Sequence, residues 1–322
     1  MKRKATALTL VVAFLFSFLF HGLLVQPVKA QSFETIVIRA DGSVDGTDKI
    51  QRDGDVYTLI SGINGSIVVE RDNVVLNGAG YGLQGDGNQN GITLGIGNNI
   101  TVKNLKLSSF NIGIVVMGSD NNKILENTIT DNFRGLDFTS SENDTVSGNY
   151  IANNIGGIAL ENMYNSIVEN TITNNSNFGI HLYGAGCNNI IGNNITDNGR
   201  GILVSICYNN VIYHNNFVNN TNHVETDDSN SIWDNGEEGN YWDNYTGLDS
   251  DGDSIGDTPY IIGENNQDNY PLINIIPEFP DGTGQNGEDK TESLPTLLVV
   301  AGTVAVVIVV AGLLVYFKRR KR

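Results

Sequence analysis

The sequence predicts an all-β fold of the parallel β-helix type, with about 22 residues in each coil. A column of glycines recurs at steps of 22 residues, and two alternating apolar residues follow each glycine. A column of asparagines keeps nearly the same spacing, and no window of the repeats shows helical periodicity. Since a strand rises ~3.3 Å per residue, one period is long enough for three short strands with their turns.

The glycine column predicts one strand in every coil, and its members are Gly113, Gly135, Gly157, Gly179 and Gly201. The apolar pairs that follow are Ile114/Val116, Leu136/Phe138, Ile158/Leu160, Ile180/Leu182 and Ile202/Val204. Residues of mixed type separate the members of each pair, which is typical of a strand with one buried face.

The asparagine column consists of Asn127, Asn149, Asn170, Asn193 and Asn215, and Leu105 holds the same place one coil earlier. A second asparagine lies five residues after each of these. A buried amide both donates and accepts, so stacked asparagines are expected to hydrogen-bond from coil to coil. Asparagine also tolerates the left-handed backbone that tight turns require.

Both ends of the chain predict a protein held at the cell surface. Residues 1–30 have the basic start, the apolar run and the Val28-Lys29-Ala30 cleavage site of a secretory signal peptide. Residues 276–295 read as a linker, residues 296–317 as a transmembrane helix without a charge, and residues 318–322 as a basic cytoplasmic tail. The N-terminal ectodomain is therefore expected outside the cell.

The charge of the outer part excludes a nucleic-acid partner. All 36 acidic residues lie between the two terminal segments, whereas only 10 of the 19 basic residues do, which gives a net charge of −26. Such a surface repels polyanions unless cations bridge them. Glycans or components of the cell envelope are the expected partners, together with the membrane through the C-terminal helix.

Three sections of the ectodomain differ in regularity. Residues 31–97 are expected to form an N-terminal cap and irregular first coils, and residues 98–235 the regular repeats. Residues 236–275 form an aromatic and Asp-rich cap, in which Trp242 and Tyr245, with Trp233 just before it, are expected to cover the exposed end of the solenoid.

The cap contains an aspartate-rich loop that predicts a structural calcium site. Carboxylates alternate with glycine turns, as in loops that surround a hard cation with oxygen ligands. The expected ligands are Asp249, Asp251, Asp253, Asp257 and the carbonyl of Ile255. The loop is similar to the aspartate-rich calcium repeats of dockerin and thrombospondin-type modules, whereas Tyr260 replaces the glutamate that ends an EF-hand loop.

The outward positions of the glycine strand place Asp137, Glu161, His181 and Tyr183 on one sheet face. Asp137 and Glu161 would lie roughly 8 Å apart, a separation that suits the two carboxylates of an inverting glycosidase. A solvated polar face, or a face that binds a glycan without cleaving it, explains the same residues and is the preferred interpretation.

Two cysteines and scattered histidines complete the candidates. Cys187 and Cys207 would lie on neighbouring rungs, either as a disulfide or as stacked buried thiols. His214 and His223 are the closest pair of histidines in the sequence, and the soft ligands form no cluster, so a copper site is not expected. Seven Asn-X-Ser/Thr sequons lie outside the terminal segments: Asn64, Asn99, Asn143, Asn174, Asn194, Asn219 and Asn244.

The repeat from Asn127 to Leu136, of the form Asn-x-Ile-x-x-Asn-x-x-Gly-Ile, resembles the repeats of NosD-like and pectin-lyase-like proteins. The segment Gly239–Tyr245 and the later Asp257-Thr258-Pro259-Tyr260 resemble the C-terminal part of archaeal NosD-like surface proteins. The resemblance covers roughly residues 55–275 and implies a right-handed parallel β-helix. The stretch Pro277-Glu278-Phe279-Pro280 is similar to an archaeal C-terminal sorting signal.

These observations favour a cell-surface β-helix protein that binds carbohydrate or serves the cell envelope without catalysis. One alternative is a polysaccharide hydrolase or lyase that acts at the face of Asp137 and Glu161. The resemblance to NosD implies another alternative, a copper-accessory protein.

Overall fold

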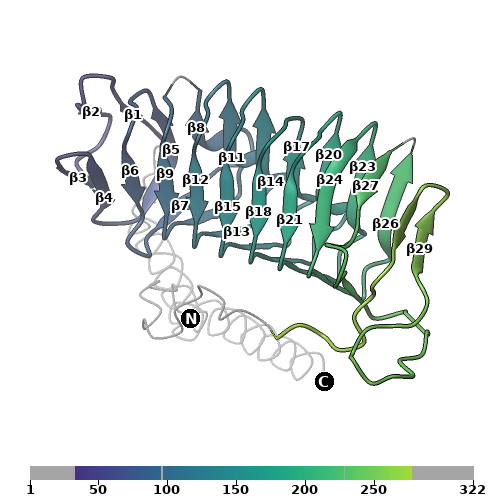
Figure 1. Cartoon of the computed structure of the whole chain (residues 1–322). Helices are drawn as coiled ribbons and strands as arrows, with labels where there is room; N and C mark the ends of the chain where they lie inside the picture. Colours follow the sequence, from purple (N-terminus) through teal and green to yellow (C-terminus); the bar gives the residue numbers. More distant parts are fainter. Residues whose placement is uncertain (1–32, 96, 228, 278–322) are drawn as a thin grey trace, which may run out of the picture. The chain divides into compact units, whose positions relative to one another are not determined.

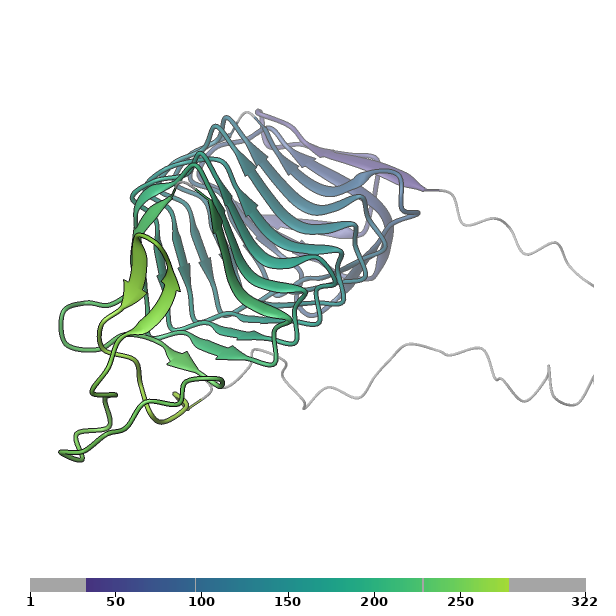
Figure 2. The same cartoon turned by 90° about the vertical axis from the view of Figure 1, so that its right-hand side faces the viewer.

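The computed structural model describes residues 33–277 except residues 96 and 228, and it confirms the parallel β-helix. Successive coils stack along one axis in a right-handed solenoid, and each regular coil contributes one strand to each of three faces (Figures 1 and 2). The described residues contain strands and turns and no helix. The expected signal peptide, most of the linker, the transmembrane segment and the basic tail lie outside the described residues.

The face whose strands contain the glycine column, here called the glycine face, has the longest strands. Within this face, each strand pairs in parallel with the next one. Its strands are β1 (Glu34–Ile38), β5 (Ile63–Val69), β8 (Asn90–Leu94), β11 (Ile112–Met117), β14 (Arg134–Thr139), β17 (Gly156–Leu160), β20 (Phe178–Tyr183), β23 (Arg200–Ser205) and β26 (Asn222–Asp227).

The second and third faces are built mostly from three-residue strands. The second face comprises β4 (Val56–Leu59), β6 (Val75–Asn77), β9 (Thr101–Lys103), β12 (Lys123–Leu125), β15 (Thr145–Ser147), β18 (Ser166–Val168), β21 (Asn189–Ile191), β24 (Tyr208–Tyr213) and β27 (Asn230–Ile232). The third face comprises β7 (Gly82–Gln84), β10 (Lys106–Ser108), β13 (Thr128–Thr130), β16 (Tyr150–Ala152), β19 (Thr171–Thr173), β22 (Asn194–Thr196), β25 (Asn216–Val218) and β28 (Tyr241–Trp242).

Antiparallel pairs close the two ends of the solenoid. At the N-terminal end, β2 (Val44–Asp45) pairs with β1, and β3 (Ile50–Asp53) pairs with β4. At the C-terminal end, β29 (Tyr260–Gly263) and β30 (Asn266–Asp268) form a hairpin beside the last coil (Figure 2). Among residues 33–277, apart from 96 and 228, no helix has the length and apolar character needed to span a bilayer.

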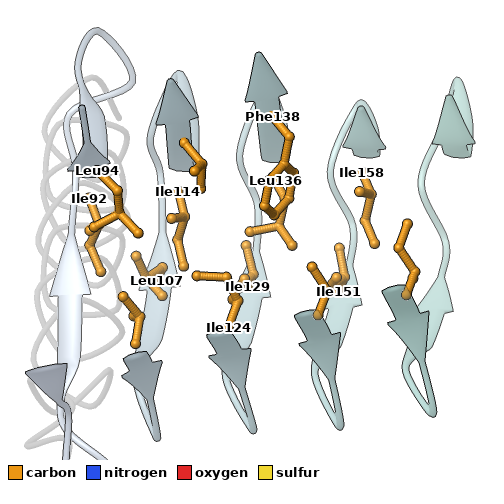
Figure 3. Packing of buried hydrophobic residues seen from close by; sticks show 14 of the residues in the cluster. Ile92, Leu94, Leu107, Ile114, Ile124, Ile129, Leu136, Phe138, Ile151 and Ile158 are labelled. Carbon is orange, nitrogen blue, oxygen red and sulfur yellow. The ribbon is translucent and has the colours of Figure 1, made fainter. Parts of the chain in front are cut away.

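The core is a set of apolar columns that run from coil to coil. Ile114 and Leu136 are fully buried partners on adjacent strands, and Ile158, Ile180 and Ile202 continue the same column. Figure 3 shows the side chains of Ile114, Leu136 and Ile158 on successive rungs. Because every coil presents the same inward positions, each rung buries the apolar side chains of the rung before it.

The predicted asparagine ladder is present at the corner between the second and third faces. The backbone N–H of Asn127 and its Nδ2 both donate to Oδ1 of Asn149, at 2.9 and 3.0 Å. The same Nδ2 donates to the carbonyl of Val102. Asn149 bonds to Asn170 in the same way, so the ladder satisfies the buried corner amides of every coil.

The corner backbone differs from the expectation in one respect. The residue before each ladder asparagine, and not the asparagine itself, has the left-handed conformation: Glu126, Gly148, Glu169, Gly192 and His214 have φ of 55°, 65°, 56°, 69° and 55°. The ladder position instead requires asparagine because its side chain both accepts and donates hydrogen bonds between coils. The asparagines five residues later form a ladder of the same kind at the corner between the third face and the glycine face.

A further ladder, which the repeat pattern did not predict, lies at the corner between the glycine face and the second face. Its members are Asn122, Asp144, Asn165, Asn188 and Asn210. They recur at 22, 21, 23 and 22 residues, the same spacing as in the other two ladders. Asp144 takes the place of an asparagine in this buried column.

The glycine column is required by close packing between coils. A Cβ atom at Gly135 would lie 2.7 Å from the carbonyl oxygen of Gly157 in the next coil. The same contact recurs at Gly113, Gly157, Gly179 and Gly201. Since contacts under 3.0 Å are essentially never seen for real Cβ atoms, any larger residue would push two coils apart.

Candidate functional site

The four residues proposed for the glycine face lie where the register placed them. Asp137 aligns with Ala159 in the next coil, and Ala159 aligns with His181 in the coil after that. Glu161 directly follows β17, and Tyr183 ends β20. The polar candidates therefore occupy the outer surface of three successive coils, around the small side chain of Ala159.

Asp137 does not present a free carboxylate. Arg134, three residues earlier on the same strand, forms an ion pair with Oδ2 of Asp137, and only 11% of the Asp137 side chain is exposed. Thr139 Oγ1 lies 3.5 Å from the other carboxylate oxygen. Because the ion pair occupies one oxygen and the side chain is largely shielded from solvent, this geometry does not favour the inverting pair of Asp137 and Glu161.

His181 is half-buried and lies between two aromatic rings. Its ring centroid is 5.3 Å from that of Phe178 and 6.1 Å from that of Tyr183. Burial lowers the pKa of His181, and the positive charges of Arg134 and Arg200 lower it further, against the smaller effect of Asp227. The imidazole is therefore neutral at pH 7 and is suited to exchange hydrogen bonds with hydroxyl groups.

Exposed aromatic and apolar side chains gather beside this polar surface. Tyr164, Tyr183, Ile206 and Tyr208, here called the tyrosine edge, lie where the chain passes from the glycine face to the second face, with Tyr208 as the first residue of β24. Between 49% and 59% of each residue is exposed. They belong to three successive coils, and the ring of Tyr208 lies against Gly186 of the coil before it. The sequence analysis identified Tyr183 alone.

A second candidate site lies at the C-terminal end, between β26 and β29. Here a cavity of about 320 Å³ is lined by residues including Asn222, His223, Asp243 and Tyr260. His223 Nε2 donates to Oδ1 of Asp243 at 2.7 Å, while the backbone N–H of Asn219 donates to the other oxygen at 2.6 Å. Burial lowers the pKa of His223 in spite of Asp243, so the imidazole is neutral at pH 7.

The two histidines named as the closest pair have separate partners. His214 lies in the corner between β24 and β25, and its Nε2 is 2.5 Å from Oε2 of Glu238. His223 lies on β26 and bonds to Asp243. In the part of the chain that the structure describes, neither belongs to a group of three or more His, Cys, Asp or Glu side chains close enough to share a metal.

The aspartate-rich loop brings together three of its predicted ligands. Single carboxylate oxygens of Asp249, Asp251 and Asp253 lie within 4.8 Å of one another, a spacing that calcium can bridge. Asp257 is outside this group of three, and its Oδ2 accepts hydrogen bonds from the N–H and hydroxyl of Ser250 in the same loop. The fifth predicted ligand, Ile255, forms an isolated antiparallel bridge with Leu272, which ties the loop to the cap.

Of the two arrangements open to the cysteines, the structure has free thiols and no disulfide between Cys187 and Cys207. Gly186 aligns with Tyr208 and Asn189 with Val211, so Cys187 and Cys207 are two positions out of register on adjacent coils. Cys207 is buried and donates to the carbonyl of Ser205 at 3.2 Å, whereas Cys187 is half-buried.

Comparison with known proteins relates the chain to a family and to two solved β-helix structures. A family model described as periplasmic copper-binding protein (NosD) matches residues 45–247. The enzymatically active domain of tailspike protein 2 from bacteriophage CBA120 is similar at 14% identity and a TM-score of 0.39, over 61% of this chain and 34% of that one. This chain thus spans about a third of that tailspike domain.

The second solved structure is the A-module of a mannuronan C-5 epimerase from Azotobacter vinelandii. It is similar at 12% identity and a TM-score of 0.29, over 64% of this chain and 82% of that one. No curated protein sequence matches the chain.

Proposed function

The chain belongs to the NosD family, whose model matches more than half of it, and we propose that it is an outward-facing, non-catalytic β-helix protein that binds glycans. The family description places such proteins in the periplasm, outside the cytoplasmic membrane. The proposed binding surface is the outer side of β17, β20 and β23 together with the tyrosine edge.

The observation that carries the proposal is the position of exposed tyrosines beside hydrogen-bonding groups on three successive coils. Tyr164, Tyr183 and Tyr208 offer flat apolar rings with a polar tip, which suit the apolar faces and the hydroxyls of sugar rings. Glu161 and the neutral His181 stand within the same coils as hydrogen-bonding partners. A linear glycan could therefore contact several coils at once.

Charge restricts the glycan to a neutral one. Arg134 is paired with Asp137, and Arg200 is paired with Glu225, so the two cations of this face are already compensated. Glu161 and Asp227 add negative charge at its edge. An anionic polysaccharide would be repelled, whereas neutral hydroxyls can bond to carboxylates and to the imidazole.

The binding experiment uses the purified full-length protein in mild detergent on an array of neutral and acidic cell-envelope glycans. We expect binding to neutral glycans, and we expect Tyr183→Ala and Tyr208→Ala each to weaken it about three- to tenfold, from the ~0.5–1.5 kcal/mol of an aromatic contact. Tyr81→Ala is the matched control, because Tyr81 is similarly exposed but precedes β7, far from the tyrosine edge along the sequence.

Absence of glycan binding, or equal binding by all three variants, would contradict the proposal. An assay for new chain ends on the same glycans separates binding from cleavage. Release of products that stops in Glu161→Gln would instead support the polysaccharide hydrolase or lyase.

Copper handling is the second candidate, and the family description and the cavity at His223 favour it. Imidazoles that bind metals usually donate their other N–H to a carboxylate, as His223 does to Asp243. The test is titration of the full chain with Cu(II). Stoichiometric uptake that is lost in His223→Gln and retained in His214→Gln would support a copper site in this cavity.

We propose two further properties for the ends of this protein. Calcium binds Asp249, Asp251 and Asp253 and holds the cap loop in place. Residues 296–317 anchor the domain, with the N-terminal ectodomain outside and the C-terminus in the cytoplasm. Alkaline carbonate extraction of cell membranes tests the anchor, since a spanning protein stays in the membrane fraction and a peripheral one is released.

A further inference from the structure

Four of the seven sequons share one structural position. Asn99, Asn143, Asn174 and Asn219 are exposed corner residues with left-handed backbone, at φ of 56°, 58°, 53° and 54°. Each stands immediately before a buried residue of a corner column. The sequon asparagine therefore lies at the surface while the residue after it is held in the corner by hydrogen bonds to the neighbouring coils.

The remaining sequons lie in different surroundings. Asn64 is in β5 and Asn194 is in β22, where each is half-buried and paired in a parallel strand. The Oδ1 atom of Asn194 is buried. Asn244 lies in the cap, where its side chain bonds to Tyr260. A glycan attached at Asn194 would have to displace neighbouring strands.

The corner sequons are also spaced along the solenoid. Asn99 and Asn143 are two coils apart at the corner between the glycine face and the second face, and Asn121 lies between them. Asn174 and Asn219 are two coils apart at the corner between the third face and the glycine face. Two coils correspond to roughly 10 Å, which leaves room for a sugar chain at each site.

The third corner, between the second and third faces, carries no sequon. Two of its corners have the threonine that a sequon needs, Thr128 and Thr171. The left-handed residue two positions earlier is a glutamate in both cases, Glu126 and Glu169, so neither is a sequon. Sequons of the corner type thus flank the glycine face on both sides and avoid the corner opposite to it.

We propose that Asn99, Asn143, Asn174 and Asn219 carry N-linked glycans, attached outside the cytoplasm from a lipid-linked oligosaccharide donor. The Nδ2 atom of asparagine forms a bond to C1 of the first sugar and loses a proton. The bond between C1 and the oxygen of the lipid phosphate or diphosphate breaks, and the phosphate leaves with its electron pair. The transferase is a separate enzyme. The inference rests on the outward location of the domain and is independent of whether the tyrosine edge binds glycans.

One existing contact at these sites must open first. Asn99 Nδ2 donates to Oδ1 of Asn73 at 2.8 Å across the exposed corner. Both side chains are exposed, so water can replace this hydrogen bond at little cost. The corner hydrogen bonds that hold Asn122 and the other ladder residues do not depend on it.

The test is glycopeptide mass spectrometry on the full-length protein purified from the cells that naturally produce it. We expect glycan mass on the peptides that contain Asn99, Asn143, Asn174 and Asn219, and none on Asn194. Unmodified peptides at all four corners, or a glycan on Asn194, would overturn the proposal. The glycan array decides the proposed function separately, so the two can fail independently.

Matched variants remove or create a sequon without changing a left-handed residue. Thr145→Val keeps the shape of the β15 side chain and should abolish the glycan at Asn143 alone, whereas Thr145→Ser should retain it. Lys123→Thr completes a sequon at Asn121, an exposed corner with φ of 61°, and should add one glycan there. Persistence of the Asn143 glycan in Thr145→Val would show that the sequon does not direct the modification.

Discussion

The regular coils and the C-terminal cap bury polar groups in two different ways. In the coils, each corner asparagine finds its partner in the equivalent asparagine of the next coil. At the cap there is no next coil, so the ladder through Asn215 and Asn240 ends on the carboxylate of Asp268. The comparison shows that a repeat supplies its own partners everywhere except at its end, where unique residues are needed.

The apolar cores of the two regions differ in the same manner. The coils stack aliphatic side chains in columns, as Figure 3 shows for Ile92, Ile114 and Leu136. The cap instead stacks Trp242 between the rings of Phe217 and Tyr260, with both centroid distances at 4.3 Å. Flat rings close the end because they cover apolar area without requiring a further coil.

The strongest test of the coil region is Asn149→Ala. It removes Oδ1, which accepts from the backbone N–H and Nδ2 of Asn127. It also removes Nδ2, which donates to the carbonyl of Ile124 and to Oδ1 of Asn170. Each buried group left unpaired costs ~1–3 kcal/mol, so the free energy of unfolding in urea should fall by about 4 kcal/mol. The control is Asn230→Ala, whose side chain is exposed, with a change within about 0.5 kcal/mol. Similar losses in both variants would contradict the ladder as the source of stability.

Trp242→Ala tests whether the cap unfolds separately from the coils. It removes the two stacking contacts, with Phe217 and Tyr260, and the hydrogen bond from Nε1 to Oδ2 of Asp268 at 2.8 Å. A loss of about 3 kcal/mol is typical of such truncations. Amide hydrogen exchange should accelerate in β29 and β30 while β11 and β14 keep their protection. Equal acceleration in all four strands would mean that coils and cap form one cooperative unit.

Asp144→Asn should stabilise the protein, because the carboxylate occupies an amide position in a buried ladder. Oδ1 accepts from Asn122, and the hydroxyl of Ser141 also faces the carboxyl, but Oδ2 is buried and the effect of burial outweighs these hydrogen bonds. Burial raises the pKa of Asp144 from 3.8 to about 6. The folded protein therefore holds the proton more tightly than the unfolded chain does. The free energy of unfolding is unaffected below pH ~4 and falls as pH rises from about 4 to 6, where the unfolded chain is ionised and the folded carboxyl still has to lose its proton.

The size of this effect follows from ~1.36 kcal/mol per pKa unit and amounts to about 2–3 kcal/mol at pH 7.5. Thermal unfolding of the wild type and Asp144→Asn at pH 4.5 and 7.5 measures it. The gain should appear at pH 7.5 and be much smaller at pH 4.5. Some pH dependence should remain in the variant, since burial also raises the pKa of Asp268 to about 6. A variant less stable than wild type at pH 7.5 would refute this account.

Removal of calcium should have the smallest effect and should act on the cap alone. For a site with a dissociation constant of ~10⁻⁴–10⁻³ M, about 2 mM calcium stabilises by about 0.6–1.8 kcal/mol. EGTA should therefore lower the thermal midpoint of the wild type slightly and leave that of Asp251→Asn unchanged. The same shift in both proteins would show that Asp249, Asp251 and Asp253 do not bind the ion.

The sequence was sufficient for the coils because every coil poses the same packing problem. The glycine steps of 22 residues predicted the aligned strands, and the asparagine steps predicted the ladder through Asn149. The ladder through Asn122 and Asn165 was missed, because Asp144 interrupts its run of asparagines. For the candidate site, Asp137, Ala159 and His181 align on three successive strands, as the register indicated.

By itself, the sequence determined the parallel β-helix, its register and the outward positions of the glycine face, since a fixed period repeats local geometry without reference to distant residues. Only the tertiary structure decided that Arg134 neutralises Asp137 and that three tyrosines gather along one edge. It also decided that Asp268 ends a ladder begun in another coil. The ion pair depends on the side-chain conformations of one strand, and the exposed cluster and the end contact depend on non-repeated residues, so periodicity carries no information about them.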